Sequence, residues 1–119
     1  FDGTSPGSWP IAVGMVRHGQ GSGHHALGTD VSWSTRWDAP DPDHGVHGCA
    51  VVVPGRASRV DDGTHDLLVT AHDPNRPFVH WAGGTWSRGL DHVTAEDWRA
   101  DVERFVARLA SPVIVEVQP

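Results

Sequence analysis

The sequence predicts a mainly β domain, an antiparallel β-sandwich with one amphipathic helix near the C-terminus. Three observations support this prediction. Fourteen glycines and nine prolines among 119 residues favour turns and short strands over helices. Short apolar stretches separated by turn-rich segments recur through the first two thirds of the chain. Near the end, the apolar period changes from that of a strand to that of a helix.

The expected strands differ in how much of each is covered. Ile11–His18 is apolar enough to be covered on both faces. Val31–Trp37 alternates apolar with polar residues, so Trp33 and its same-face neighbours predict a half-buried strand. Gly19–Gly28 and Asp38–Gly48 are expected to be loops because they are rich in Gly, Pro and polar residues. Further strands are expected at Cys49–Val53, Asp66–Ala71 and Phe78–Ala82.

One helix is expected to begin after Thr94, a good N-cap, with Glu96 and Asp97 in a first turn where the helix dipole favours acids. Its apolar face is formed, at helical spacing over about four turns, by Trp98, Val102, Phe105, Val106 and Leu109. The residues expected to face solvent are Arg99, Glu103, Arg104 and Arg108. Pro112 is expected to end the helix, and Val113–Val117 predicts a final strand.

Length and charge restrict what the chain can be. With 119 residues it forms one domain at most. We expect residues 1–10 to be a linker-like segment and residues 11–119 to be a single β-rich domain. The formal net charge of −6 argues against nucleic acid or an anionic membrane as a partner. No apolar run is long enough to predict a membrane helix.

The chain opens at Phe1 in a segment that resembles a linker inside a longer protein. We therefore expect a processed chain, the C-terminal part or one chain of a larger protein, with a second polypeptide of the same precursor as a partner. The single cysteine, Cys49, cannot form an internal disulfide. It lies in an apolar expected strand, which predicts a buried and inert thiol.

The segment His80–His92 is the most informative part of the chain. It combines two tryptophans and two histidines with Arg88 and Asp91. Its paired glycines let the backbone turn or approach another surface closely. Flat indole faces beside such polar groups are what proteins present to a sugar. The alternative is that the tryptophans are core residues, since large aromatic side chains dominate core energetics.

This ending resembles the C-terminal part of a family of secreted bacterial proteins of unknown function, found among genes for pectin and rhamnose-polysaccharide utilisation. The family's ending has the pattern aromatic-aromatic-Ala-Gly-x-Gly-Trp-x-Arg/Lys-x-x-Asp, and His80–Asp91 stands in its place here. Glu96–Trp98 early in the helix and Ser111–Val113 before the last strand continue the similarity. Upstream, Ile11–His18 and Gly48–Pro54 are similar to two strands of that family. The family is longer than this chain.

The resemblance implies a supersandwich-like β-sandwich, an extracellular or periplasmic location, and a carbohydrate partner of the plant or exudate polysaccharide type. It also implies that the protein, if an enzyme, is a polysaccharide lyase cleaving next to a uronic acid by β-elimination. One departure matters for that activity. The family has an aromatic residue, often Tyr, where His80 stands, and this chain contains no Tyr.

β-Elimination requires a cation for the uronate carboxylate, a base for the C5 proton and an acid for the leaving oxygen. Arg88 is the candidate cation, through a two-pronged contact. His80 or His92 is the candidate base, because imidazole titrates near the working pH. The expected substrate-binding residues are Trp81, Trp86 and Asp91. An exposed ion pair between Arg88 and Asp91 is the alternative.

Two other functions remain open at this point. The chain could be a non-catalytic carbohydrate-binding module with a platform of tryptophans, or a structural piece that completes a larger sandwich. An enzyme should hold His80, Arg88 and Asp91 in one cleft, whereas a binding module should present exposed coplanar indoles. A hydrolase would need a second carboxylate facing the bond, and spacing singles out none beside Asp91.

We expect no metal ion and no cofactor. His24 and His25 are adjacent, and His44 and His47 have a His-x-x-His spacing in an acidic loop. Zinc would need further ligands from elsewhere, and exposed loop histidines are the alternative. The glycine-rich segment Gly19–Gly23 lacks the helix and the Lys that a phosphate-binding loop requires.

Overall fold

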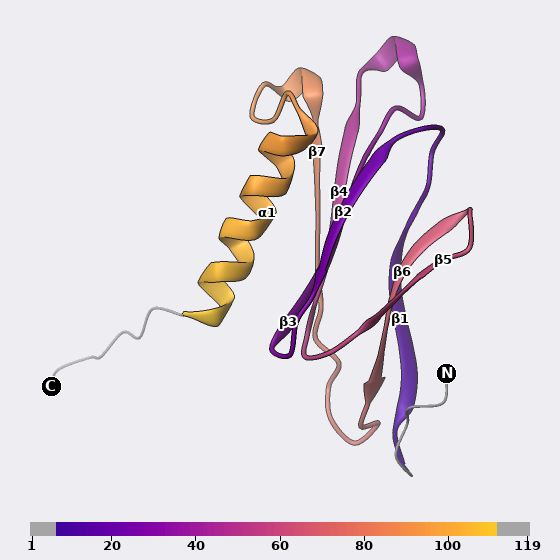
Figure 1. Cartoon of the computed structure of the whole chain (residues 1–119), viewed down its shortest axis with the longest axis vertical. Helices are drawn as coiled ribbons and strands as arrows, with labels where there is room; N and C mark the ends of the chain where they lie inside the picture. The colour runs from indigo at the N-terminus through magenta and orange to yellow at the C-terminus, as the bar shows by residue number, and fades with distance from the viewer. Residues whose placement is uncertain (1–6, 112–119) are drawn as a thin grey trace, which may run out of the picture.

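The structure is a computed structural model and describes residues 7–111. The helix α1 (Ala95–Ala110) lies on one side of a four-stranded sheet, and a three-stranded sheet lies on the other (Figure 1). The smaller sheet has the order β1 (Trp9–Val16), β6 (His65–His72), β5 (Ser58–Asp61). The larger sheet has the order β2 (Ser22–Leu27), β3 (Val31–Asp38), β4 (His47–Pro54), β7 (Trp81–Trp86). All pairs are antiparallel. The predicted antiparallel β-sandwich with one C-terminal helix is confirmed.

The larger sheet is the middle layer, and both of its faces are covered. Side chains alternate between the two faces along each strand. The core on the α1 side contains Trp33, Ala50, Val52, Trp98 and Val102. The core between the sheets contains Met15, Val51, Val53 and Leu68. β4 supplies apolar side chains to both cores, which explains its unbroken apolar run.

β3 is buried on both faces, so the expectation of a half-buried strand is wrong. Its odd-numbered residues, which include Trp33, share one face as the alternation predicts, and this face packs against α1. The opposite face carries buried polar residues, among them Arg36 and Asp38. These two side chains form a two-pronged ion pair, with Nη2–Oδ1 at 2.8 Å and Nε–Oδ2 at 3.2 Å. Asp38 also accepts the backbone N–H of His18 at 3.0 Å. Because the two charges are paired with each other, the Arg36 and Asp38 side chains can be buried on the face of β3 that points away from α1.

β2 occupies much of the segment Gly19–Gly28, which the sequence predicted as a loop. It pairs with β3 along its whole length. A side chain at Gly21 would collide with Asp38, and a Cβ atom at Gly23 would lie 3.2 Å from Arg36 Nη1. Glycine at these positions leaves room for the buried ion pair. The strand therefore lacks the β-branched residues that identify most strands in a sequence.

Two further strands differ from the prediction. β5 was not predicted, and its polar, charged sequence explains why. β7 runs through Gly83 and Gly84, whereas the sequence predicted a strand over Phe78–Ala82. Phe78 precedes the strand, and its ring stacks on that of His80 with centroids 5.5 Å apart.

Cys49 is exposed, and the expectation of a buried thiol is therefore wrong. The neighbouring Ala50 belongs to the core under α1, so strand alternation places Cys49 on the face toward the smaller sheet. Partial desolvation raises the pKa of the Cys49 thiol, and the nearby Asp38 carboxylate raises it further. Cys49 is thus protonated at neutral pH, the form that reacts slowly.

α1 has the cap and the apolar face that the sequence predicts. Thr94 Oγ1 accepts the backbone N–H of Asp97 at 3.1 Å. Trp98 Nε1 donates to the carbonyl of Cys49 at 2.9 Å, which anchors the first turn on β4. The apolar face then packs mainly on β3 and β4.

The end of α1 is also the end of what the structure describes. The helix stops at Ala110, and Ser111 caps it. Pro112 and the predicted strand Val113–Val117 lie outside the described residues. Within residues 7–111, no helix is long and apolar enough to cross a membrane.

Candidate functional site

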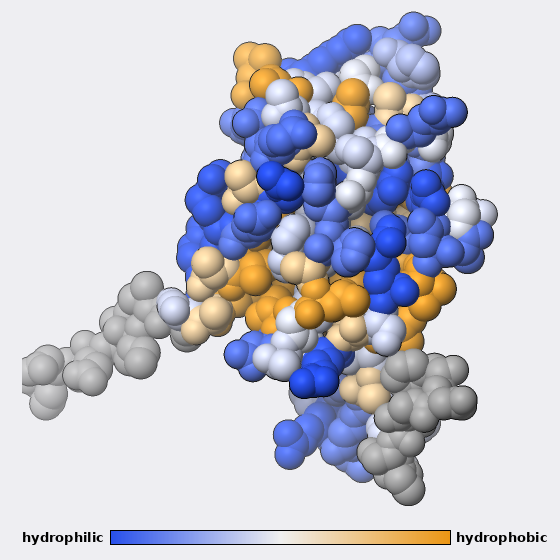
Figure 2. All heavy atoms as spheres, in the orientation of Figure 1, coloured by the Kyte–Doolittle hydropathy of each residue, from blue (hydrophilic) through white to orange (hydrophobic). Residues whose placement is uncertain are grey.

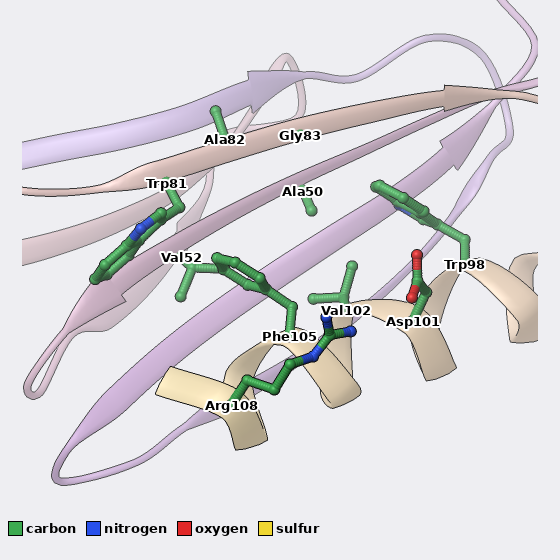
Figure 3. A pocket seen from close by; sticks show the side chains of 10 residues that line it. All are labelled: Ala50, Val52, Trp81, Ala82, Gly83, Trp98, Asp101, Val102, Phe105 and Arg108. Atoms are coloured by element: carbon green, nitrogen blue, oxygen red, sulfur yellow. The ribbon is translucent and has the colours of Figure 1, made fainter. Parts of the chain in front are cut away.

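A groove of about 520 Å³ lies between α1 and the β7 side of the larger sheet (Figure 3). It is open because α1 packs mainly on β3 and β4. The floor is open, since Ala50 and Gly83 have almost no side chain to fill the space. Figure 2 shows apolar surface exposed between the lower half of α1 and the neighbouring strands. The size falls within the range of small-molecule sites in proteins.

Aromatic rings form the walls of this groove. Trp81 and Trp98 lie at its two ends, with Phe105 between them (Figure 3). Trp81 meets Phe105 edge to face, with ring centroids 6.2 Å apart and the planes at 72°. Trp98 is buried and holds the helix to the sheet. The ring faces of Trp81 and Phe105, which are only partly buried, are therefore the ones that a ligand can reach.

Two charged side chains stand at the helical rim. Asp101 and Arg108 are seven residues apart on α1, so their Cα atoms are separated by about 10 Å along the axis. The Arg108 side chain leans back toward the first half of the helix, beside Phe105 (Figure 3). Within residues 7–111, Arg108 forms no ion pair, and its one hydrogen bond runs from Nε to the carbonyl of Arg104 at 3.4 Å. The terminal nitrogens of Arg108 thus remain available to a ligand.

Asp101 is held by a chain of hydrogen bonds that crosses from β7 to α1. Thr85 Oγ1 lies 2.8 Å from His92 Nδ1, and His92 Nε2 lies 3.0 Å from Asp101 Oδ2. An ionised carboxylate only accepts, so Nε2 donates to Asp101 and a neutral imidazole accepts the Thr85 hydroxyl at Nδ1. The His92 ring also meets Trp98 edge to face at 5.1 Å.

This Thr85–His92–Asp101 chain has the order of a nucleophilic triad, but the placement of Thr85 does not suit attack. Thr85 does not line the groove. It also does not line a polar hollow on the other side of Asp101, which is formed by residues 90–93, Asp97, Ala100, Asp101 and Arg104. Both nitrogens of His92 are already engaged. These hydrogen bonds therefore fix the Asp101 carboxylate at the groove, where its remaining lone pairs can still accept from a ligand.

The structure does not bring all of the sequence-predicted catalytic residues together. His80 precedes β7, while Arg88 and His92 follow it. The six residues of β7 span about 20 Å. His80 stacks on Phe78 at one end of the strand, and His92 lies at the other end with Asp101.

Arg88 and Trp86 belong to a separate cluster around two short 3₁₀ turns, Pro42–His44 and Ser87–Gly89. Arg88 Nη2 donates to the carbonyl of Asp43 at 2.8 Å, and Trp86 Nε1 donates to the carbonyl of His44 at 2.7 Å. The described residues contain no ion pair between Arg88 and Asp91. Asp91 is exposed and lines the polar hollow next to His92.

Trp81 and Trp86 do not form one platform. They are five residues apart in a strand, so their side chains leave opposite faces of the sheet. Trp81 faces α1 and lines the groove. Trp86 is 45 % exposed on the other face.

The histidine pairs do not form a metal site in the part of the chain that the structure covers. There, no group of three or more His, Cys, Asp or Glu side chains is placed to hold an ion. His24 and His25 are neighbours in β2 and point to opposite faces. His44 Nδ1 lies 2.6 Å from Asp41 Oδ2, so it is engaged within its own turn.

Three groove residues were missed as functional candidates by sequence reasoning. Phe105 was expected to be core, Arg108 was expected to be a solvated charge, and Asp101 was not singled out. The sequence did contain one signal. Asp101 and Arg108 are seven residues apart, and so are Trp98 and Phe105. This spacing of about two helical turns puts both pairs on the same side of the helix.

We compared the sequence with models of protein families, with curated proteins and with solved structures. The sequence model of the family described as domain of unknown function (DUF4861) matches residues 3–115. A search of curated proteins and a search of solved structures each gave no match. The matched range includes both sheets, α1 and every residue of the groove. The chain therefore belongs to the DUF4861 family, as the resemblance to a domain-of-unknown-function family predicted.

Proposed function

We propose that this domain binds carbohydrate in the groove between α1 and β7 and serves in the handling of plant-type or exudate polysaccharides. One observation carries the proposal: two partly buried aromatic rings, Trp81 and Phe105, share a groove with two charged groups. These are a fixed carboxylate, Asp101, and the Arg108 guanidinium, which has no ion pair within residues 7–111. Sugar rings have apolar C–H faces that stack on aromatic rings and hydroxyls that bond to charged groups. The groove supplies both kinds of contact.

The resemblance in the sequence motif supports the same class of ligand. The similar proteins are secreted and lie among genes for pectin and rhamnose-polysaccharide utilisation. We therefore propose an extracellular or periplasmic location for the protein.

The position of Asp101 favours a second candidate, a lyase acting by β-elimination. Asp101 would take the C5 proton of a uronic acid, and the electron pair would form the C4–C5 double bond as the C4–O bond breaks. Water would supply the proton to the leaving oxygen, and Arg108 would neutralise the sugar carboxylate. These roles replace those expected for His92 and Arg88, because neither of those side chains lines the groove.

Binding is tested by isothermal titration of the 119-residue protein with pectin, arabinogalactan and cellulose oligosaccharides. Trp81→Ala should weaken binding more than about ten-fold, because truncating an aromatic anchor at a binding surface costs about 2 kcal/mol. Trp86→Ala is the matched control and should bind normally. Circular dichroism of both variants shows whether they fold. Asp101→Asn provides a second groove variant that leaves the Trp81–Phe105 contact in place.

The two candidates separate in a single assay. A lyase produces an unsaturated sugar that absorbs ultraviolet light, and Asp101→Asn should abolish this signal while binding persists. Binding without any unsaturated product identifies a binding module. Loss of binding in Trp86→Ala with full binding in Trp81→Ala would place the site on the opposite face and overturn the groove.

A further inference from the structure

We infer that the groove selects acidic sugars and that Arg108 is the residue that binds their carboxylate. This inference rests on the proposed function, because it names the class of carbohydrate that the same groove takes.

The first support comes from how the arginines of this chain are paired. All nine lie within the described residues, and six of them have a carboxylate partner within 4 Å there: Arg17, Arg36, Arg59, Arg76, Arg99 and Arg104. Arg88 bonds to a backbone carbonyl instead. Among residues 7–111, only Arg56 and Arg108 have neither a carboxylate within 4 Å nor a hydrogen bond from a terminal nitrogen, since Arg108 bonds to a backbone carbonyl through Nε alone. In a chain with a net charge of −6, an unpaired cation is the exception.

The second support is where this cation lies. Arg108 lines the groove beside Phe105, and the same groove has Trp81 at one end (Figure 3). An aromatic wall next to a guanidinium contacts the ring of a uronic acid and its carboxylate at the same time. The planar guanidinium matches a carboxylate through two parallel hydrogen bonds.

The third support is that the other charge in the groove is compensated. Asp101 accepts from His92 at 3.0 Å and lies 3.4 Å from Arg104 Nη2. Its repulsion of an anionic ligand is thereby reduced, while its remaining lone pairs still accept sugar hydroxyls. The groove therefore presents a free positive charge and a partly neutralised negative charge.

The experiment compares one ligand in two charge states. Trigalacturonic acid and its methyl ester have the same rings, but the ester carries no charge. We expect the acid to bind about five-fold more tightly to the native chain, a modest factor because Arg108 is exposed and screened by water. Arg108→Gln should remove this preference. Arg56→Gln removes an equally unpaired arginine away from the groove, is the matched control, and should keep the preference.

The outcomes distinguish this inference from the function on which it rests. Preference for the acid that weakens with added salt and disappears only in Arg108→Gln supports the inference. Equal binding of acid and ester, or preference for the acid that survives in Arg108→Gln, overturns it while leaving carbohydrate binding in place. Failure of the native chain to bind these trimers or any neutral oligosaccharide overturns the proposed function and this inference together.

Discussion

Replacing Asp38 with asparagine tests whether the buried ion pair of β3 holds the two sheets together. The side chains of Arg36 and Asp38 are only 5 % and 4 % exposed. Asp38 accepts two bonds from the guanidinium and one from the backbone of His18, which follows β1. One carboxylate thus connects a strand of the larger sheet to the chain that leaves the smaller sheet.

The expected loss follows from leaving a buried guanidinium without its counter-charge. Removing one partner of a buried ion pair costs about 3–5 kcal/mol. In Asp38→Asn, the amide oxygen can still accept the His18 N–H, so we expect a loss near the lower end, about 3 kcal/mol. A small domain has a total free energy of unfolding of about 5–15 kcal/mol. The variant should therefore still fold, with a clearly reduced stability.

Urea titration followed by tryptophan fluorescence measures this loss. Arg36→Met removes the other charge, and the double variant Arg36→Met/Asp38→Leu replaces the pair with apolar side chains. We expect the double variant to recover most of the stability lost in either single variant, since the two effects are coupled. The reasoning is refuted if Asp38→Asn costs less than about 1 kcal/mol, or if the double variant loses the sum of the two single losses.

Two further predictions concern packing and pH. Gly48→Ala should destabilise by about 1–3 kcal/mol in the same urea assay, because its Cβ atom would lie 3.0 Å from Trp98 in the core; Gly89→Ala, with open space, should be neutral. Backbone donors above all, with Arg17 and His65 assisting, lower the pKa of Asp61 and Asp62. Their contribution is therefore present above the unfolded pKa, about 4, and is lost as the pH falls through the lower folded values. In the Asp61→Asn variant, the free energy of unfolding should therefore fall less steeply than in the native chain as the pH is lowered through this range. An equally steep fall in both proteins would contradict this.

The helix was the part of the fold most open to prediction. Its signals are local: Thr94 caps the first turn, and Trp98 and Phe105 repeat at helical spacing over a long segment. The strands of the interior were predictable for a similar reason, because apolar runs such as Val51–Val53 are interior in any sandwich. Both kinds of signal depend only on residues close together in the sequence.

β2 and the inner face of β3 were not predictable in this way. Gly21 and Gly23 resemble loop residues until Arg36 and Asp38 are known to lie against them. Conversely, Arg36 and Asp38 resemble solvent-facing residues until their pairing is known. Each segment explains the composition of the other, and the two are linked only through a non-local pairing.

The candidate site shows the same dependence on register. Trp81 and Trp86 appeared to be partners as long as Gly83 and Gly84 could form a turn, since a turn leaves the directions of the two indoles undefined. Once the glycines are part of a continuous β7, the odd spacing of five residues directs the indoles to opposite faces of the sheet.

Gly83 also helps to form the groove, because its missing side chain leaves the floor open beside Trp98. Asp101 and Arg108 line the groove only because α1 lies over that floor. A motif of adjacent residues thus included the strand that forms one side of the groove, whereas the other side comes from a helix face that no contiguous motif records.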